Sequence, residues 1–195
     1  MKLFKIRCDN KYRVPLLDNR EENNRYLVGK EWHSLREGWH PLPFSFYADP
    51  KDIKKGWNKQ PDICIYHEGL FIRVDLISVI FPEKPVELEL LPILIDGEHW
   101  MLLNCLKTTK DYDPEQSKFY RSGENQQIYM IKHLVLYDSS VEPIGLFTLE
   151  DSNRAGIFVT ESFVERINKL GLKGVEFNEI GVLEPRQCDK GRTSD

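Results

Sequence analysis

The feature that most constrains the fold is an Asp-Gly pair at residues 96 and 97, which lies between two apolar runs. A type I′ turn needs positive φ at both of its central residues, and Asp-Gly is one of the few pairs that adopt it readily. The run from Val86 to Ile95 begins by alternating apolar and acidic residues, which is typical of a half-buried strand. With a return strand from His99 to Leu106, the sequence predicts a β-hairpin near the middle of the chain.

Short apolar segments elsewhere predict a sheet with further strands. These segments are residues 1–8, Ile63–Tyr66, the run that begins at Gly69, Ile128–Tyr137, Ile144–Leu149, Ile157–Val159 and Val175–Phe177. The spacing favours an α/β (α+β) fold, with one domain over residues 1–183 that contains a mixed, mainly antiparallel sheet and a few short helices. Its core is expected over residues 61–183. The polar residues 184–195 are expected to fray.

A less regular part of that domain is expected over residues 1–60. After the first strand the chain is polar and rich in tryptophan and proline. A helix over residues 20–37 is one interpretation, after which Pro41 and Pro43 require extended chain. Residues 107–127 are also polar and are expected to form a loop.

The clearest helix signal follows Ser162. Ser162 and Glu165 have the spacing of a capping box, in which each side chain satisfies a free backbone amide at the helix start. Phe163, Ile167 and Leu170 then follow on one helical face. The glycines at 171 and 174 predict the end of this helix.

Two segments of the chain resemble each other. Gly69–Ile80 and Gly156–Ile167 share glycine, phenylalanine and isoleucine at matching positions, and Val86–Leu88 then matches Val175–Phe177 if the second copy has two extra residues. Each copy predicts a strand, a short helix and a strand. An internal duplication and chance similarity are both compatible with this pattern.

Charge and cysteine content suggest the location of the protein and the kind of partner it has. The net charge is −4, which divides into +5 for residues 1–60, −6 for residues 61–120 and −3 for residues 121–195. Such asymmetry can steer a charged partner, but it does not favour binding of nucleic acid by the middle of the chain. The sequence begins without the apolar segment of a signal peptide and contains no long apolar span, so a cytoplasmic protein without membrane contact is expected. The four scattered cysteines favour reduced, buried thiols over disulfides.

The sequence carries no recognised catalytic pattern, so it predicts no enzyme. No histidine has metal-ligand spacing, and the sequence has neither a nucleophile elbow nor a glycine-rich phosphate loop. Cys105 with a distant histidine is a candidate nucleophile pair, but its apolar surroundings favour core packing. We therefore expect no catalytic residues, no bound metal and no cofactor.

Two groups of residues are candidates for partner binding. Glu87 and Glu89 alternate with apolar residues on one expected strand, and three acidic residues follow on the polar loop. The acidic candidates are Glu87, Glu89, Asp111, Asp113 and Glu115. They are interpreted either as a solvated face or as an acidic surface for a basic partner. Trp32 and Trp39, seven residues apart, form either an aromatic binding patch or a cover for the core.

Several segments, in order along the chain, resemble the bacterial immunity protein 11 family. They are Pro61–Ile63, Gly69–Ile72, Leu90–Ile93, Asp96–Glu98, Leu102–Leu106, Ile157–Phe163 and Gly171–Phe177. The resemblance covers roughly residues 60–180, and its most specific part is the closing strand–helix–strand unit. It has no clear counterpart in residues 1–60.

The resemblance implies a role in polymorphic toxin systems, in which an immunity protein binds a toxin encoded beside it. The expected function is stoichiometric binding and neutralisation of a cognate toxin in bacterial competition. A nuclease is one candidate for the toxin, whose class the sequence leaves open. The family has no recognised catalytic motif. An enzyme that reverses a toxin's modification is the first alternative, and it predicts a deep pocket with convergent polar groups. A structural or regulatory interaction module is the second.

Overall fold

Strands dominate the structure, with a few short helices between them. The computed structural model describes residues 1–17, 19, 27, 34–67, 69–83, 87–137, 141, 145–152 and 156–185. The strands are β1 (Lys2–Cys8), β2 (Val14–Leu16), β3 (Leu42–Tyr47), β4 (Ile63–Tyr66), β5 (Gly69–Arg73), β6 (Leu88–Ile95), β7 (Glu98–Cys105), β8 (Thr108–Thr109), β9 (Lys118–Ser122), β10 (Gln127–Leu136), β11 (Leu146–Leu149), β12 (Phe158–Thr160) and β13 (Val175–Leu183). The helices are α2 (Pro50–Lys54), α3 (Ile77–Ile80) and α4 (Glu161–Lys169), with 3-10 turns η1 (Val74–Leu76) and η3 (Glu150–Ser152).

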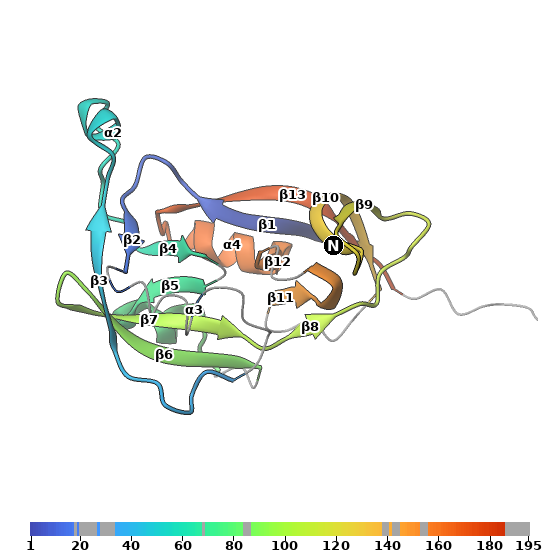
Figure 1. Cartoon of the computed structure of the whole chain (residues 1–195), viewed down its shortest axis with the longest axis horizontal. Coiled ribbons are helices and arrows are strands. Elements are labelled where there is room, and N and C mark those ends of the chain that lie inside the picture. The colour runs from blue at the N-terminus through green and yellow to red at the C-terminus, as the bar shows by residue number, and fades with distance from the viewer. Residues whose placement is uncertain are drawn as a thin grey trace, which may run out of the picture.

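The strands form two mixed sheets within one α/β domain (Figure 1). The first sheet has the order β2-β3-β6-β7-β5-β4, and the second has the order β8-β11-β12-β1-β13-β10-β9. Most neighbouring pairs are antiparallel, and β3–β6, β10–β13 and β8–β11 are parallel. The predicted fold class is confirmed, with the strands divided between two sheets.

The predicted central hairpin is confirmed. β6 and β7 pair antiparallel over their full length, from Leu88 opposite Cys105 to Ile95 opposite Glu98. The two residues between them have the positive φ values that a type I′ turn requires, 51° at Asp96 and 83° at Gly97. The Asp96 carboxylate also accepts a hydrogen bond from the Phe46 amide, so the turn is tied to β3.

The two sheets share one arrangement of strands. In the order β3-β6-β7-β5-β4 the first pair is parallel and the next three are antiparallel. The order β10-β13-β1-β12-β11 repeats these directions. In each sheet a helical segment links two parallel strands that are separated by one antiparallel strand, which is a split β-α-β unit. The outermost strands differ, because β2 pairs with the end of β3 whereas β9 pairs with the beginning of β10.

Strand register aligns the two units residue by residue. In the first sheet Met101 lies between Ile72 and Pro92. In the second sheet Phe4 lies between Val159 and Glu179, and both neighbours are 87 residues further along the chain than their counterparts (159 − 72 and 179 − 92). The offset is constant across the helix, so the expected two-residue insertion in the second copy is wrong. Agreement of five strands in order, direction and register supports an internal duplication over chance similarity.

β1 completes the second unit from the opposite end of the chain. By its position β1 corresponds to β7, but β7 follows β6 through the Asp96-Gly97 turn whereas β1 precedes every other strand. The Met1 amino group donates to the Leu183 carbonyl at 3.0 Å, and the Leu183 amide donates to the Met1 carbonyl at 2.7 Å. The start of β1 therefore lies beside the end of β13, where the first sheet has its hairpin turn.

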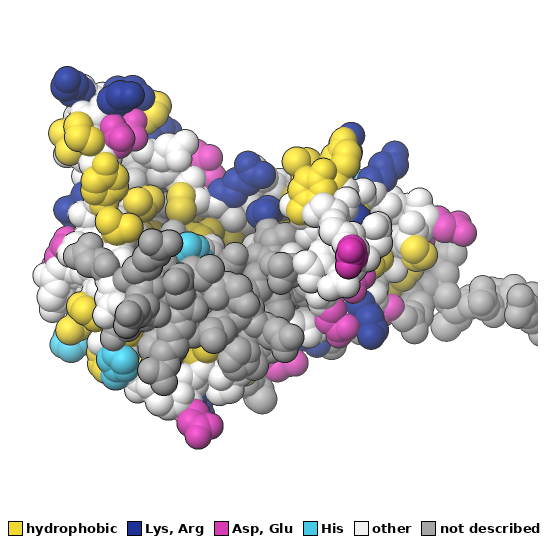
Figure 2. Space-filling view, in the orientation of Figure 1, with side chains coloured by type: hydrophobic (Ala, Val, Ile, Leu, Met, Phe, Trp, Pro, Cys, Tyr) yellow, Lys and Arg dark blue, Asp and Glu magenta, His cyan; other side chains and the backbone are white. Residues whose placement is uncertain are grey.

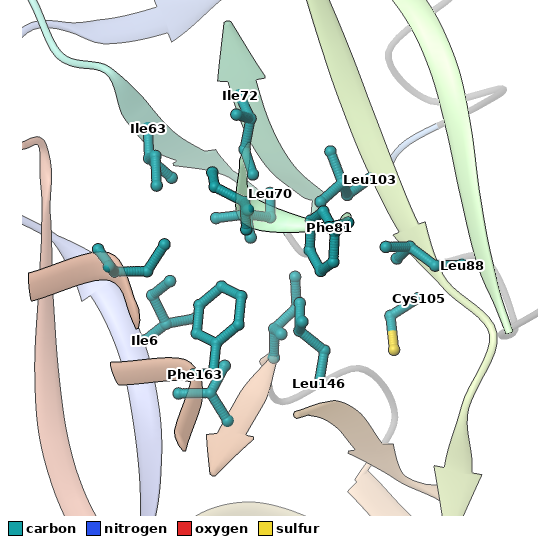
Figure 3. Close-up of a cluster of buried hydrophobic side chains, with 14 residues drawn as sticks. Ile6, Ile63, Leu70, Ile72, Phe81, Leu88, Leu103, Cys105, Leu146 and Phe163 are labelled. Carbon is teal, nitrogen blue, oxygen red and sulfur yellow. The ribbon is translucent and has the colours of Figure 1, made fainter. Parts of the chain in front are cut away.

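Equivalent residues from the two units meet in one central core. This cluster joins side chains from both sheets with α3 and α4, including Leu70, Ile72 and Leu103 from the first sheet and Ile6 and Leu146 from the second (Figure 3). Two smaller clusters cover the outer faces, one around Phe71 on the first sheet and one around Phe158 on the second. The inner and outer cores follow from the alternation of apolar side chains along each strand, because successive residues face opposite sides of a sheet.

Three expectations about local structure need correction. α4 has Thr160 as its N-cap with no side-chain cap hydrogen bond, and Ser162 lies inside the helix, so the capping box is wrong. Residues 107–127 are not simply a loop, because β8 and β9 lie within them. Residues 9–60 contain β2, β3 and α2, so this part is more regular than expected. Most of the expected helix over residues 20–37, like most of the 184–195 tail, lies outside the described residues.

The duplication predicts that β1 can be moved to the other end of the second unit. In a permuted chain, Asp-Gly joins Leu183 to Met1 and new termini open between Asp9 and Asn10. This chain should fold to the same structure, since the junction replaces a gap that is already bridged by hydrogen bonds. Its free energy of unfolding, measured by chemical denaturation, should lie within about 2 kcal/mol of an unpermuted chain that ends at Leu183. A permuted chain without a cooperative transition would contradict the equivalence of β1 and β7.

The turn predicts a specific effect of Gly97→Val. A Cβ at this glycine would meet no heavy atom within 4 Å, so any loss of stability reflects the positive φ and not a clash. Valine should lower the free energy of unfolding by about 1–3 kcal/mol. Gly97→Asn is the matched control, because asparagine tolerates positive φ. Equal stability of the two variants would contradict the turn assignment.

Candidate interaction surface

Glu89 is not on the solvent face that the sequence predicted. Glu89 is only 4% exposed. Its carboxylate accepts hydrogen bonds from the Leu35 amide and from the Asn104 side chain, both at 2.9 Å, and from the Ser34 hydroxyl. Burial opposes ionisation, but these hydrogen bonds and the nearby Arg36 guanidinium outweigh it, so the pKa of Glu89 lies below its ordinary value. Glu89 therefore holds the chain against the sheet and cannot contact a partner.

The duplicated unit shows why alternation misled the prediction. The position equivalent to Glu89 is Glu176, 87 residues later, and Glu176 is exposed. On the first sheet, apolar residues of the preceding chain cover this outer face, among them Leu27, Leu35 and Trp39. An alternating strand predicts that its polar residues share a face, but a segment distant in sequence can still bury that face.

The other acidic candidates differ in their surroundings. Asp113 accepts a hydrogen bond from the Tyr137 hydroxyl at 2.6 Å and others from the Gln116 side chain and amide, which hold its pKa well below the ordinary range. Asp113 is thus engaged in organising the turn before β9. Glu87 lies 3.8 Å from the Lys107 amino group. Glu115 is exposed and Asp111 is half-buried.

Trp39 covers the core, as the second of its two interpretations predicted. Its ring packs against the outer cluster of the first sheet, and its indole nitrogen donates to the Pro92 carbonyl at 2.9 Å. Trp32 lies outside the described residues, so a shared patch with Trp39 is not described.

A different aromatic surface rises from the molecule at α2. Tyr47 at the end of β3, Ile53 in α2 and Trp57 after it are 47%, 49% and 36% exposed. Lys51 and Lys54 are exposed on the same short helix. We call these five residues the α2 patch, which stands above the body of the protein at the upper left of both views (Figures 1 and 2). Clustered exposed apolar side chains among lysines are typical of an interaction site.

Local sequence explains why α2 forms without support from the core. Asp49 caps the helix by accepting from the Lys51 amide at 2.8 Å, and Pro50 occupies the first turn, where its missing N–H is harmless. Gly56, with φ of 74°, ends the helix, and the Trp57 amide folds back to the Asp52 carbonyl. None of the residues of α2 is buried.

The base of the projection is tied to the N-terminal chain. The Arg13 amide donates to the Lys59 carbonyl at 3.0 Å, and the Lys59 amide donates to the Lys11 carbonyl at 3.3 Å. Above this base, the Lys55 ammonium lies 4.5 Å from the centre of the Trp57 ring. The aromatic side chain is therefore exposed but held in position. A tryptophan among lysines directly after an Asp-Pro helix start is the sequence signal for this site, which the expectation of an irregular segment over residues 1–60 overlooked.

A shallow apolar cavity of about 350 Å³ lies beside α3. Its lining residues are Val74, Ile77, Ser78, Phe81, Pro82, Leu90 and Met101. Ser78 is the only polar residue among them, so this cavity lacks the convergent polar groups that the enzymatic alternative predicts.

The described thiols are free, and two of them are fully buried. Cys64 and Cys105 are buried and Cys8 is half-buried, while Cys188 lies outside the described residues. Burial raises the pKa of the Cys105 thiol to about 12, which disfavours the nucleophilic thiolate. In the described part of the chain, no group of three or more His, Cys, Asp or Glu residues could hold a metal ion. None of the described helices has both the length and the apolar character needed to cross a membrane.

The buried carboxylate predicts a pH-dependent loss of stability in Glu89→Gln. Glutamine cannot accept from all three donors, so the free energy of unfolding should fall by about 2 kcal/mol at neutral pH. Folding lowers the pKa of Glu89. The stability difference between the wild type and the variant therefore has its full size above the ordinary carboxyl pKa of about 4.5, and it becomes smaller as the pH falls through the lower pKa of the folded state. The measurement is chemical denaturation between pH 3 and pH 7. Glu176→Gln, at the exposed equivalent position, is the matched control and should change stability by less than about 0.5 kcal/mol. A pH-independent difference would contradict the ionised network.

Comparison with known proteins adds no functional assignment to this geometry. No protein-family model matches the chain, and no curated protein matches it. The resemblance to the immunity protein 11 family therefore depends on the sequence segments described above.

Proposed function

We propose that this chain is an immunity protein that binds a cognate bacterial toxin and neutralises it by stoichiometric protein–protein interaction. The α2 patch is the observation that carries the proposal. Tyr47, Ile53 and Trp57 expose apolar surface within one projecting segment. Apart from Tyr120 and Tyr129, the other aromatic side chains that the structure describes are buried or half-buried. Tryptophan and tyrosine are enriched among the residues that dominate binding energy at protein interfaces.

The resemblance to immunity proteins supplies the kind of partner. A cognate toxin is encoded beside its immunity protein and is made in the same cell, so we place the interaction in the cytoplasm. The projecting α2 patch suits an inhibitor. A convex, preorganised segment can enter a concave site on a partner without first being ordered. The α2 patch is carried by the first sheet, because α2 follows β3.

We infer a different charge for the contact from the one that the sequence suggested. A basic nuclease was one candidate because of the acidic middle of the chain, but Glu89 is buried and Asp113 is hydrogen-bonded within its own turn. The α2 patch instead carries lysines. The segment from 47 to 60 contains four lysines and two aspartates, a net charge of +2.

Trp57→Ala should weaken binding to the toxin domain encoded by the neighbouring gene. Loss of a central tryptophan typically costs about 2 kcal/mol or more, so the dissociation constant should rise by about 30-fold or more. Binding is measured by calorimetry with the purified toxin domain, and protection by growth of cells that express both proteins. Tyr47→Ala should act in the same direction.

Val79→Ala is the matched control, because Val79 is 50% exposed on α3 and lies outside the patch. It should leave binding and protection unchanged, and all variants should unfold like the wild type. If the wild-type protein does not bind the toxin domain, the immunity proposal is wrong. If it binds and Trp57→Ala binds equally well, the α2 patch is not the contact.

A further inference from the structure

A second surface of similar composition lies on the β9–β10 hairpin. Tyr120, Tyr129 and Met130 are 39%, 53% and 50% exposed, and Lys118 and Lys132 are exposed beside them. We call these five residues the hairpin patch. Tyr120 lies opposite Met130 in the strand pairing, and its ring lies 6.0 Å from that of Tyr129.

The hairpin patch forms because the two strands are irregular here. The register of β9 and β10 shifts between Ile128 and Met130 and again between Ile131 and His133. Such bulges re-aim side chains and increase local twist. Ile128 stays in the core while its neighbours Tyr129 and Met130 both become exposed, which regular alternation would not allow.

The two patches share their chemistry. At each patch a lysine ammonium lies over an exposed aromatic ring. The distance is 4.5 Å for Trp57 and Lys55, which directly follows α2, and 4.7 Å for Tyr120 and Lys132. The hairpin segment from 118 to 133 contains three basic residues and one glutamate, a net charge of +2 that equals the charge of the α2 segment. The whole chain carries −4, so these two segments are basic prominences on an acidic protein.

Both prominences rise on the same side of the molecule. Figure 2 shows apolar side chains with lysine or arginine at the upper left, over α2, and at the upper right, over β9 and β10, with a lower surface between them. Strands β1 and β13 run beneath this lower surface (Figure 1). These strands expose polar and charged side chains such as Arg7 and Glu176. The surface between the two patches, which we call the floor, is therefore polar, whereas each patch exposes apolar side chains.

We propose that the two patches bind one acidic partner molecule at the same time, with the partner spanning the floor formed by β1 and β13. This inference depends on the proposed function, because it names the chemistry and the extent of the surface through which the toxin is bound. Lysines at both ends attract a partner face rich in Asp and Glu and reject a basic one. The aromatic rings, held by their lysines, then supply apolar contact at two separated points.

A two-point contact has a measurable signature. Once one patch is bound, the second binds within the same complex, so losing either patch weakens the affinity strongly although the other remains intact. Charge reversal at either end should mainly slow association, and the effect should weaken as salt screens the charges.

The test uses the full-length protein and the purified toxin domain encoded by the neighbouring gene. Three variants are compared with the wild type: Lys118→Glu/Lys132→Glu on the hairpin, Lys51→Glu/Lys54→Glu on α2, and Lys169→Glu on α4 as a control outside both patches. Association rates are measured by stopped-flow at low and high salt. Each double variant should associate about tenfold more slowly at low salt and approach the wild-type rate at high salt, and the control should not change.

A second measurement addresses the apolar contact. Photo-crosslinking residues at positions 47 and 129 should each attach to the same toxin molecule in a 1:1 complex, and Tyr129→Ala should raise the dissociation constant by about tenfold. Thermal unfolding shows that the variants fold.

The outcomes separate the two proposals. If the hairpin variants bind like the wild type while Trp57→Ala does not, the two-point contact is wrong and the proposed function stands. Faster association after charge reversal would show a basic partner and overturn the acidic assignment. If the wild-type chain does not bind the toxin domain, both proposals fail.

Discussion

The second half of the structure depends on the pairing of one strand, β1, between β12 and β13. β1 occupies this inner position and pairs with both neighbouring strands, and its Leu3 and Ile6 supply buried side chains to the cores on the two faces of the sheet. Without β1 the second sheet would have two unpaired inner edges, and an unpaired edge exposes backbone groups that seek another strand. The first sheet solves the same problem locally, because β7 follows β6 through a two-residue turn. The two units therefore have the same architecture but different chain connections.

The duplication also makes functional differences visible. Where the units agree, as at Ile72 and Val159 or at Ile80 and Ile167, the residues are buried in the shared core and serve folding. Where they differ, the surfaces differ. Glu89 is buried beneath the chain that precedes β3, whereas its equivalent Glu176 is exposed between the two prominences. The prominences lie where the units differ. α2 follows β3, and the irregular pairing of β9 with the beginning of β10 has no match in the pairing of β2 with the end of β3.

Much of the fold could be predicted from the sequence, and less of the site. Asp96-Gly97 determined its hairpin because the turn chemistry is local, and the strands from Ile63 to Arg73 followed from short apolar runs bounded by turn residues. The place of β1 could not be predicted, because its partners lie more than 150 residues away in sequence. The burial of Glu89 could not be predicted for a related reason. Alternation correctly separated Glu89 from the central core, but only the folded chain shows that Ser34 and Leu35 cover it. The α2 patch was locally encoded and was missed because residues 1–60 were treated as irregular.

The position of β1 has a consequence for how the chain folds as it is made. All strands of the first unit lie before Leu106, so they can pair with one another as soon as they are available. β1 is synthesised before the other described strands but has no strand partners until Phe158–Thr160 and Val175–Leu183 follow. During that interval its apolar side chains remain uncovered, and the loop that must close is among the longest in the chain, which slows the final step. The nascent protein therefore passes through a stage with one finished sheet and one open sheet, and this stage is the one at which a chaperone would act or strand exchange between copies would begin.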